Sequence, residues 1–443
     1  MFLRHLGLCY SYEYMAIEFE KKVLKNGLRV VLASMKNTEA ITLLVLVGVG
    51  SRHETKNVNG ISHFLEHMFF KGTKSRPRPG QVFRDLDRIG AAFNAFTKKD
   101  MTGFWVKTSS KDFGVGLDVV SDILLEPLFN KEEIEKERGV ILQEIGMYED
   151  EPRNKVWDNL FSVLYGDQPL GWSIAGPKET VLSIKRKDVI DYKSKNYLSK
   201  NMVVVLAGDF ENGDIFPKVE KVFGRISPGK NRSAKKAGID QKSPRVGITN
   251  KASDQTHLLL AAKSFGLFDE RRYGANVLDV ILGGNISSRL FSEIREKLGL
   301  AYYVFSDNSY FEDTGFLGIG TGTGHGSLET CVRKTLEILK KLKNKKVSTR
   351  ELGAAKSFLR GRMALGMEMS DAVAGYCAEN EFFFHRIEQP EEYLEKIEKV
   401  SQNDILKIAS DMFKPNKMSM AVIGAHEDAQ KKEEFYKKLI SEL

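Results

Sequence analysis

Cysteines and long apolar stretches are scarce in this chain of 443 residues. The three cysteines, Cys9, Cys331 and Cys377, are scattered and odd in number, which excludes a disulfide framework and a Cys-x-x-Cys metal site. No apolar run approaches the roughly 18 residues that a membrane-spanning helix needs. We therefore expect no membrane contact and a reducing compartment, the cytoplasm.

Charge of one sign does not dominate either. The net charge is +8, from 67 Lys and Arg against 59 Asp and Glu. Such a balance can indicate nucleic-acid binding. Basic and acidic residues alternate along most of the chain, however, and a solvated helix end explains the densest basic cluster, 340–346. No nucleic-acid motif accompanies the charge, so we expect no nucleic-acid partner and keep that function as an alternative.

The length is too great for one compact core and predicts two or more domains. The pattern predicts strands at 28–32 and 41–49 within residues 17–50. A weak repeat of roughly 200 residues follows: strand pair, helix, strand pair, two helices. This order predicts an α+β fold of two homologous domains, each a largely antiparallel sheet with helices on one face. The expected divisions are an N-terminal extension, two domains and a polar linker between them: 1–16, 17–226, 227–244 and 245–443.

Two of the eight histidines carry the clearest chemical signal. His63 and His67 are four residues apart, with Glu66 just before the second, and on a helix both imidazoles would share one face. That spacing allows both rings to bind one zinc ion, with the glutamate beside it. The opposite face would pack in a core, through Ile61, Phe64, Leu65 and Met68. The alternative is a helix with two unrelated histidines.

A catalytic zinc site needs a third protein ligand and an open position. Candidates lie in the predicted helix 131–150, where Glu137 and Glu144 are seven residues apart at one edge of the buried stripe. Glu133 and Glu151 lie near the same edge, so spacing alone cannot choose among the four. Solvated carboxylates at a helix edge remain the competing interpretation.

Four segments together resemble the pitrilysin/insulinase family of zinc metallopeptidases, the inverzincins, and in particular its short members related to the mitochondrial processing peptidase β subunit. The resemblance runs from about Glu18 onward and rests on GISHFLEHMFFKGT (60–73), GAAFNAFTKKDMTGF (90–104), ERGVILQEI (137–145) and SSRLFSEIREKLGLAYYVFS (287–306).

The resemblance assigns roles to residues of these segments. It implies one Zn²⁺ per chain, with Glu144 as the third ligand beside His63 and His67, and Glu137 as a supporting carboxylate. It implies that an edge strand binds the substrate, through Asn94, Ala95 and Phe96. In the second domain it implies a catalytic pair, Arg295 and Tyr302; without the family, a surface arginine and a half-buried tyrosine would be the simpler interpretation.

The expected reaction is hydrolysis of short or unfolded peptides, with Glu66 taking a proton from a metal-activated water. Arg295 and Tyr302 would stabilise the oxyanion. Long family members join four such domains, and this chain has length for two. We therefore expect a homodimer that places the Arg295 pair opposite the other chain's zinc, although pairing with a related subunit is possible. A non-catalytic assembly subunit is the remaining alternative.

Overall fold

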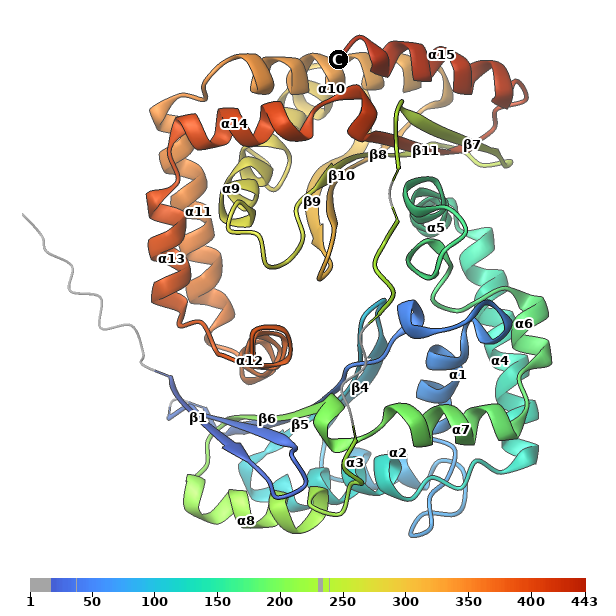
Figure 1. Ribbon diagram of the computed structural model, residues 1–443, viewed down its shortest axis with the longest axis vertical. Helices are drawn as coiled ribbons and strands as arrows, with labels where there is room; N and C mark the ends of the chain where they lie inside the picture. The colour runs from blue at the N-terminus through green and yellow to red at the C-terminus, as the bar shows by residue number, and fades with distance from the viewer. Residues whose placement is uncertain (1–16, 37, 230–233, 239) are drawn as a thin grey trace, which may run out of the picture.

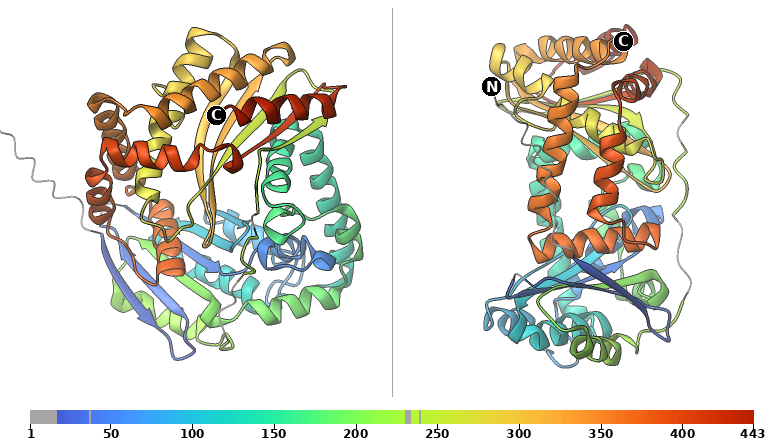
Figure 2. Two further views of the ribbon diagram at one scale, coloured as in Figure 1. Left: turned by 45° about the horizontal axis from the view of Figure 1, so that its top comes forward. Right: turned by 90° about the vertical axis from the view of Figure 1, so that its left-hand side faces the viewer.

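The computed structural model describes residues 17–36, 38–229, 234–238 and 240–443, so the predicted extension 1–16 lies outside the described residues. Two α+β halves face each other across the middle of the molecule (Figure 1). The described parts of the connection between them, within 227–244, lie along one side of the molecule (Figure 2). The described residues of 227–244 carry neither helix nor strand.

The first half contains a six-stranded sheet with the order β1-β2-β6-β3-β5-β4. Its elements are β1 (Glu18–Val23), β2 (Arg29–Ser34), β3 (Ala40–Val47), α1 (Ile61–Met68), α2 (Gln81–Asp87), β4 (Ala92–Thr97), β5 (Thr102–Ser109), α3 (Phe113–Leu125), α4 (Lys131–Asp150), α5 (Pro152–Tyr165), α6 (Lys178–Ser183), α7 (Arg186–Asn196), β6 (Met202–Gly208) and α8 (Asn212–Phe223).

The second half contains a five-stranded sheet with the order β7-β11-β8-β10-β9. Its elements are β7 (Arg245–Asn250), β8 (Thr256–Ser264), α9 (Arg272–Leu282), the π-helical turn η6 (Phe291–Lys297), β9 (Ala301–Tyr310), β10 (Gly315–Thr323), α10 (Leu328–Asn344), α11 (Thr349–Gly366), α12 (Ser370–Phe384), α13 (Pro390–Lys399), α14 (Gln402–Met412), β11 (Met418–Gly424) and α15 (Ala429–Ser441).

The two sheets share one topology, which confirms the predicted α+β fold of two similar domains. Strands β2-β6-β3-β5-β4 of the first sheet correspond in order to β7-β11-β8-β10-β9 of the second. All pairs are antiparallel except β2–β6 and β7–β11. The expectation of two strands in 17–50 was wrong, because β1 adds a third. Its sequence EFEKKV is polar and largely exposed, so it carries no buried-strand pattern.

One face of each sheet packs against helices of its own half. Apolar residues of α1, α3 and α4 form one core with strands β2, β3, β5 and β6. Helices α9, α10 and α14 form the corresponding core on the second sheet. The chain thus buries two separate cores, as its length requires.

The other face of each sheet receives a helix from the opposite half (Figure 1). Helix α12 covers the first sheet through Val373, Ala374, Cys377 and Ala378. Helix α5 covers the second sheet through Val156, Leu160 and Leu164. This reciprocal exchange places α5, and the end of α4 before it, between the two sheets.

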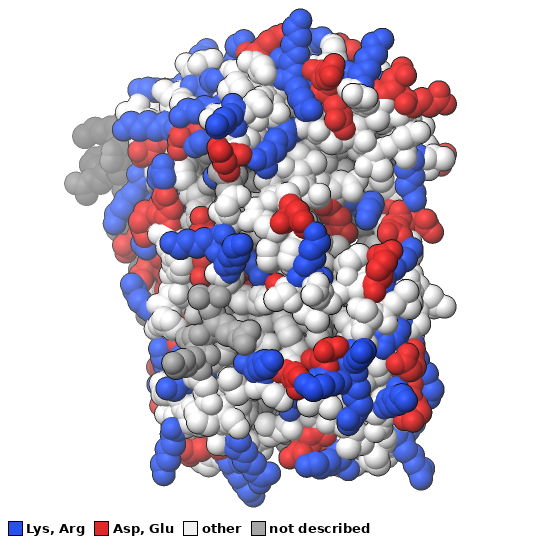
Figure 3. All heavy atoms as spheres, turned by 45° about the vertical axis from the view of Figure 1, so that its right-hand side comes forward, with Lys and Arg blue, Asp and Glu red and all other residues white. Residues whose placement is uncertain are grey.

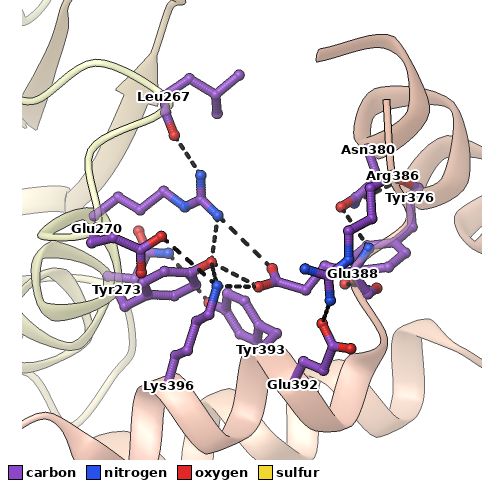
Figure 4. Close-up of polar contacts among 12 residues, drawn as sticks. Leu267, Glu270, Tyr273, Tyr376, Asn380, Arg386, Glu388, Glu392, Tyr393 and Lys396 are labelled. Carbon is purple, nitrogen blue, oxygen red and sulfur yellow. Dashed lines mark hydrogen bonds and ion pairs between the residues drawn. The ribbon is translucent and has the colours of Figure 1, made fainter. Parts of the chain in front are cut away.

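Ion pairs fix the C-terminal end of α12 to both halves. On the first half, the buried carboxylate of Glu381 lies 2.8 Å from Lys21 Nζ and 3.5 Å from Arg29 Nη1. On the second half, Glu388 accepts hydrogen bonds from Tyr273 Oη and Lys396 Nζ, each at 2.8 Å (Figure 4). Helix α12 is therefore held rigidly over the first sheet.

No helix in the described part of the chain has the length and apolar character to cross a bilayer. Basic and acidic side chains are interspersed on the face drawn in Figure 3.

Candidate active site

Helix α1 is positioned by a buried carboxylate that precedes it. Glu54 accepts hydrogen bonds from the backbone N–H groups of Gly60 (2.7 Å) and Ser62 (2.8 Å) and from Asn59 Nδ2 (2.8 Å). These N–H groups have no partner within the helix, so the carboxylate caps it from outside. Gly60 has φ +98°, and a Cβ there would lie 2.3 Å from Ala175 O. Both features fix where α1 begins.

The amphipathic pattern of α1 orients its two histidines as predicted. Ile61, Phe64, Leu65 and Met68 are buried in the core. His63, Glu66 and His67 line a cleft of about 1060 Å³ on the other side. The helix thus supports the cleft with one face and presents nitrogen and oxygen atoms to it with the other.

Three metal-ligand atoms converge in this cleft. His63 Nε2 and His67 Nε2 are 3.2 Å apart, and Glu144 places carboxylate oxygens 3.8 Å and 3.4 Å from them. Zinc bonds near 2.1 Å in tetrahedral geometry separate neighbouring ligand atoms by about 3.4 Å. The residues present therefore fit one zinc ion. Among the described residues, this is the one group of three His, Cys, Asp or Glu side chains with ligand atoms within 4.8 Å of one another.

The surroundings of the two histidines shift their pKa values in opposite directions. Burial and the neighbouring His67 lower the pKa of His63 to about 3, so this ring is neutral at pH 7. Glu137 Oε1 lies 2.8 Å from His67 Nδ1. A carboxylate can only accept at neutral pH, so His67 Nδ1 carries a proton. Burial opposes the charged ring, but Glu137, Glu144 and Glu66 outweigh it and raise the pKa of His67. A metal at Nε2 would therefore displace a proton from that atom.

Glu137 is itself held by a lysine on the turn after α1. Its second carboxylate oxygen lies 2.6 Å from Lys71 Nζ. Burial opposes ionisation of Glu137, but hydrogen bonds from His67 and Lys71 outweigh it and lower the pKa. The chain of contacts Lys71–Glu137–His67 fixes the orientation of the second imidazole.

The other two glutamates proposed from spacing lie outside the cluster. Glu133 pairs with Lys136 at 2.6 Å, and Glu151 accepts a hydrogen bond from Asn154 at 2.6 Å. Of the four carboxylates, only Glu144 and Glu137 face α1. The difference arises from the rotation of α4 about its axis, which the packing of Ile134, Ile141 and Ile145 sets.

Glu66 lies between the metal-ligand cluster and strand β4. Thr97 Oγ1 donates a hydrogen bond of 2.5 Å to Glu66 Oε2. Burial raises the pKa of Glu66, and the Thr97 hydrogen bond opposes the rise. A partly desolvated carboxylate held by one hydrogen bond can accept a proton from a nearby water.

Strand β4 is an edge strand of the first sheet, and Asn94, Ala95 and Phe96 line the cleft. Its outer backbone groups have no neighbouring strand and can pair with an extended peptide. Aromatic side chains from α4, α5 and the segment 171–177 form the far wall, namely Tyr148, Trp157, Phe161 and Trp172.

Arg295 and Tyr302 lie together, but neither lines the cleft. Arg295 Cζ is 6.0 Å from the centroid of the Tyr302 ring. Gly299, with φ +60°, ends the turn η6 between them, as the sequence predicts. Tyr302 is 74% exposed at the start of β9. Within one chain, this pair therefore faces solvent.

Three residues around the site were missed by the sequence analysis: Glu54, Lys71 and Thr97. Lys71 and Thr97 stand inside the quoted segments 60–73 and 90–104, next to predicted site residues. Glu54 shows no local signal, because its partners are backbone N–H groups that only the folded helix presents.

The cluster combines the His-x-x-Glu-His of α1 with Glu144 from α4, three side chains that could hold one metal ion. Comparisons with known proteins place it in a family. The family model for insulinase (peptidase family M16) matches residues 29–178, and that for the peptidase M16 inactive domain matches 183–359. The chain belongs to peptidase family M16.

Relatives in this family span nearly the whole chain. The uncharacterized zinc protease YmxG of Bacillus subtilis is 35% identical, over 88% of this chain and 94% of its own. An uncharacterized zinc protease of Rickettsia felis is 34% identical, over 92% and 98%. A crystal structure of a protease from Helicobacter pylori superposes with a TM-score of 0.86 at 25% identity, covering 92% of this chain and 99% of that one.

Proposed function

We propose that this chain is a zinc-dependent endopeptidase that cleaves short or unfolded peptides bound in extended form along β4. The observation that carries the proposal is the convergence of His63, His67 and Glu144 next to Glu66, at the edge of a sheet. The names of the relatives, zinc proteases, agree with it.

Each residue of the cluster has a role in this proposal. His63, His67 and Glu144 hold one zinc ion, and Glu137 keeps His67 in the ligating tautomer. The ion supplies Lewis acidity for a water and a peptide carbonyl. Glu66 takes the proton of the attacking water and delivers it to the leaving amine. Thr97 keeps Glu66 pointed at the cleft.

The cleft favours extended substrates. Pairing with β4 uses main-chain hydrogen bonds, which tolerate many side chains. The aromatic wall leaves space for a peptide strand between itself and β4, and folded proteins do not present such a free strand. Peptide cleavage is thus expected to depend on unfolding of the substrate.

The position of Arg295 and Tyr302 supports a second chain in the active enzyme. Both are suitable donors for a developing oxyanion, yet they lie outside their own cleft. A two-fold homodimer would bring the pair of one chain to the cleft of the other. Mixing Arg295→Ala with Glu66→Gln chains tests this arrangement. Random exchange should restore about one quarter of the wild-type sites, whereas no recovery after verified exchange would exclude shared sites.

Glu66→Gln is the direct test of the proposed activity. The amide keeps the shape of the side chain but cannot take a proton. We expect one zinc per chain by metal analysis and a loss of peptide cleavage of at least about 1000-fold. Glu133→Gln, on α4 but outside the cluster and paired with Lys136, is the matched control. Wild-type rates in Glu66→Gln would refute the mechanism.

A further inference from the structure

A second cavity lies beside the cleft, on the face of the first sheet that α12 covers. It has a volume of about 280 Å³. We call it the α12 groove and define it by its apolar lining, Leu44, Leu46, Phe96, Trp105, Gly375 and Ala378. Phe96 lines both cavities, so the groove adjoins the edge strand β4.

The groove is preformed, because α12 is tied down at both ends. At its first turn, Ser370 Oγ lies 2.9 Å from Thr42 Oγ1, and Asp371 lies 2.7 Å from Lys107 Nζ. At its last turn, Arg29 Nη1 donates a 2.9 Å hydrogen bond to the carbonyl of Glu381. The following loop is held by the Glu388 contacts (Figure 4). Between these ties Ala374 and Ala378 pack on the sheet, and the space beside Gly375 stays open.

In the second half, a side chain fills the position that corresponds to the α12 groove. The Phe96 ring covers Gly103 on β5, and the Phe305 ring covers Gly320 on β10 in the same way. Trp157 of α5 stacks on Phe305, with ring centroids 6.3 Å apart. Gly375 in α12 and Trp157 in α5 stand at the same position when each helix is counted from its first residue. Gly375 is therefore the counterpart of Trp157.

The first half leaves this place open. A Cβ built at Gly375 would meet no atom within 4 Å. Phe96 thus lacks the covering indole that Phe305 has, and the Lys98 ammonium at the rim of the groove lies 5.4 Å from the centroid of its ring. The charged rim carries both signs, in the pairs Lys98–Glu379 (3.0 Å) and Lys107–Asp371 (2.7 Å). A neutral apolar group therefore suits the groove.

A peptide paired with β4 must send every second side chain to this face of the sheet. Thr97 points to Glu66 on the α1 face, so its neighbour Phe96 marks the α12 face. Strands lie about 4.8 Å apart, so the groove begins about 5 Å from an added strand, at Phe96 of β4, and extends over β5. A large side chain that leans over β4 reaches its near end, whereas a small one does not.

We propose that the α12 groove is a specificity subsite for one long apolar side chain of the substrate, with an aromatic ring as the best occupant. The inference rests on the proposed function and adds a substrate preference to it. It makes Gly375 a specificity-determining residue, through the space that its missing side chain leaves.

The test fills the groove from α12. Gly375→Leu places its side chain in open space on a helix, where leucine is a better helix former than glycine. Gly361→Leu in α11, a helical glycine with no atom within 4 Å of its Cβ, is the matched control. Phenylalanine is moved through each position of an alanine-rich peptide, and kcat/KM is measured for wild type and both variants.

We expect wild type to prefer phenylalanine over alanine at one position. The ratio of the two kcat/KM values should fall at least about tenfold in Gly375→Leu. Zinc content should be unchanged, and Gly361→Leu should keep the wild-type ratio. An unaltered ratio in Gly375→Leu, or an equal loss for all peptides, would overturn the subsite. Failure of the proposed function is a separate result: wild type would cleave no peptide in a Glu66-dependent manner.

Discussion

The two halves of this chain share a strand order. They differ in the side chains that the first core helix carries beside the edge strand. In the first half, α1 carries two histidines and a glutamate beside β4. In the second half, α9 reads RYGANVLDVIL and has no histidine. One contact persists: Ser306, the residue after Phe305, donates a 2.5 Å hydrogen bond to Asp279, as Thr97 after Phe96 does to Glu66. The fold is thus common to both halves, and the cluster of His63, His67 and Glu144 belongs to the first half.

The largest expected effect is the loss of zinc and activity when a histidine is removed from the first half but not from the second. His67→Ala removes a ligand and should lower both zinc content and peptide cleavage, the latter by at least about 1000-fold. His325→Ala, in the second half, should keep the zinc. Metal analysis and kcat/KM measure both. Equal zinc loss in the two variants would contradict a site confined to the first half.

Metal removal should destabilise the first half selectively. A ligand present at 100 times its dissociation constant adds about 2.7 kcal/mol to the stability of the state that binds it. Chelation should therefore increase hydrogen exchange in α1 and α4 and leave α9 and α11 nearly unchanged. A uniform increase through both halves would show that zinc supports the whole chain.

Acid should lower the folding stability of the second half by protonating His426. Burial, aided by Lys432 and His325, lowers its pKa from 6.5 to about 4. The folded state therefore resists protonation, and its stability is complete above pH 6.5 and falls as the pH drops toward 4. Between pH 6.5 and 5 the loss is on the order of 1 to 2 kcal/mol. Denaturant unfolding at both pH values should show it, and His426→Asn should remove most of it. An unchanged acid loss in that variant would assign the effect to other groups.

The smallest effect concerns the one contact that the halves share. Thr97→Val removes the hydrogen bond to Glu66 at nearly constant volume and should cost about 1 kcal/mol, or roughly fivefold in kcat, with zinc retained. Ser306→Ala is the matched change in the second half and should leave kcat unaltered. Equal kcat values in wild type and Thr97→Val would mean that Glu66 is held by its helix alone.

Local pattern predicted α1 and its two faces, because helical spacing alone decides which side chains share a face. It could not choose among four glutamates on and just after α4, since the rotation of α4 relative to α1 depends on how three isoleucines of α4 pack in the core that both helices share. It also missed β1, which is polar, and Glu54, whose partners are backbone groups. Gly375 had no signal, because an open space is a property of the surrounding helices and strands.

The exchange of α5 and α12 means that neither half completes its own sheet. Each half alone would expose the apolar face that the other half's helix covers. A protease cut in the linker should therefore leave two fragments that stay associated and elute as one species, whereas residues 17–226 expressed alone should aggregate. The two copies of one topology are interlocked, and each depends on the other for the cover of one face of its sheet.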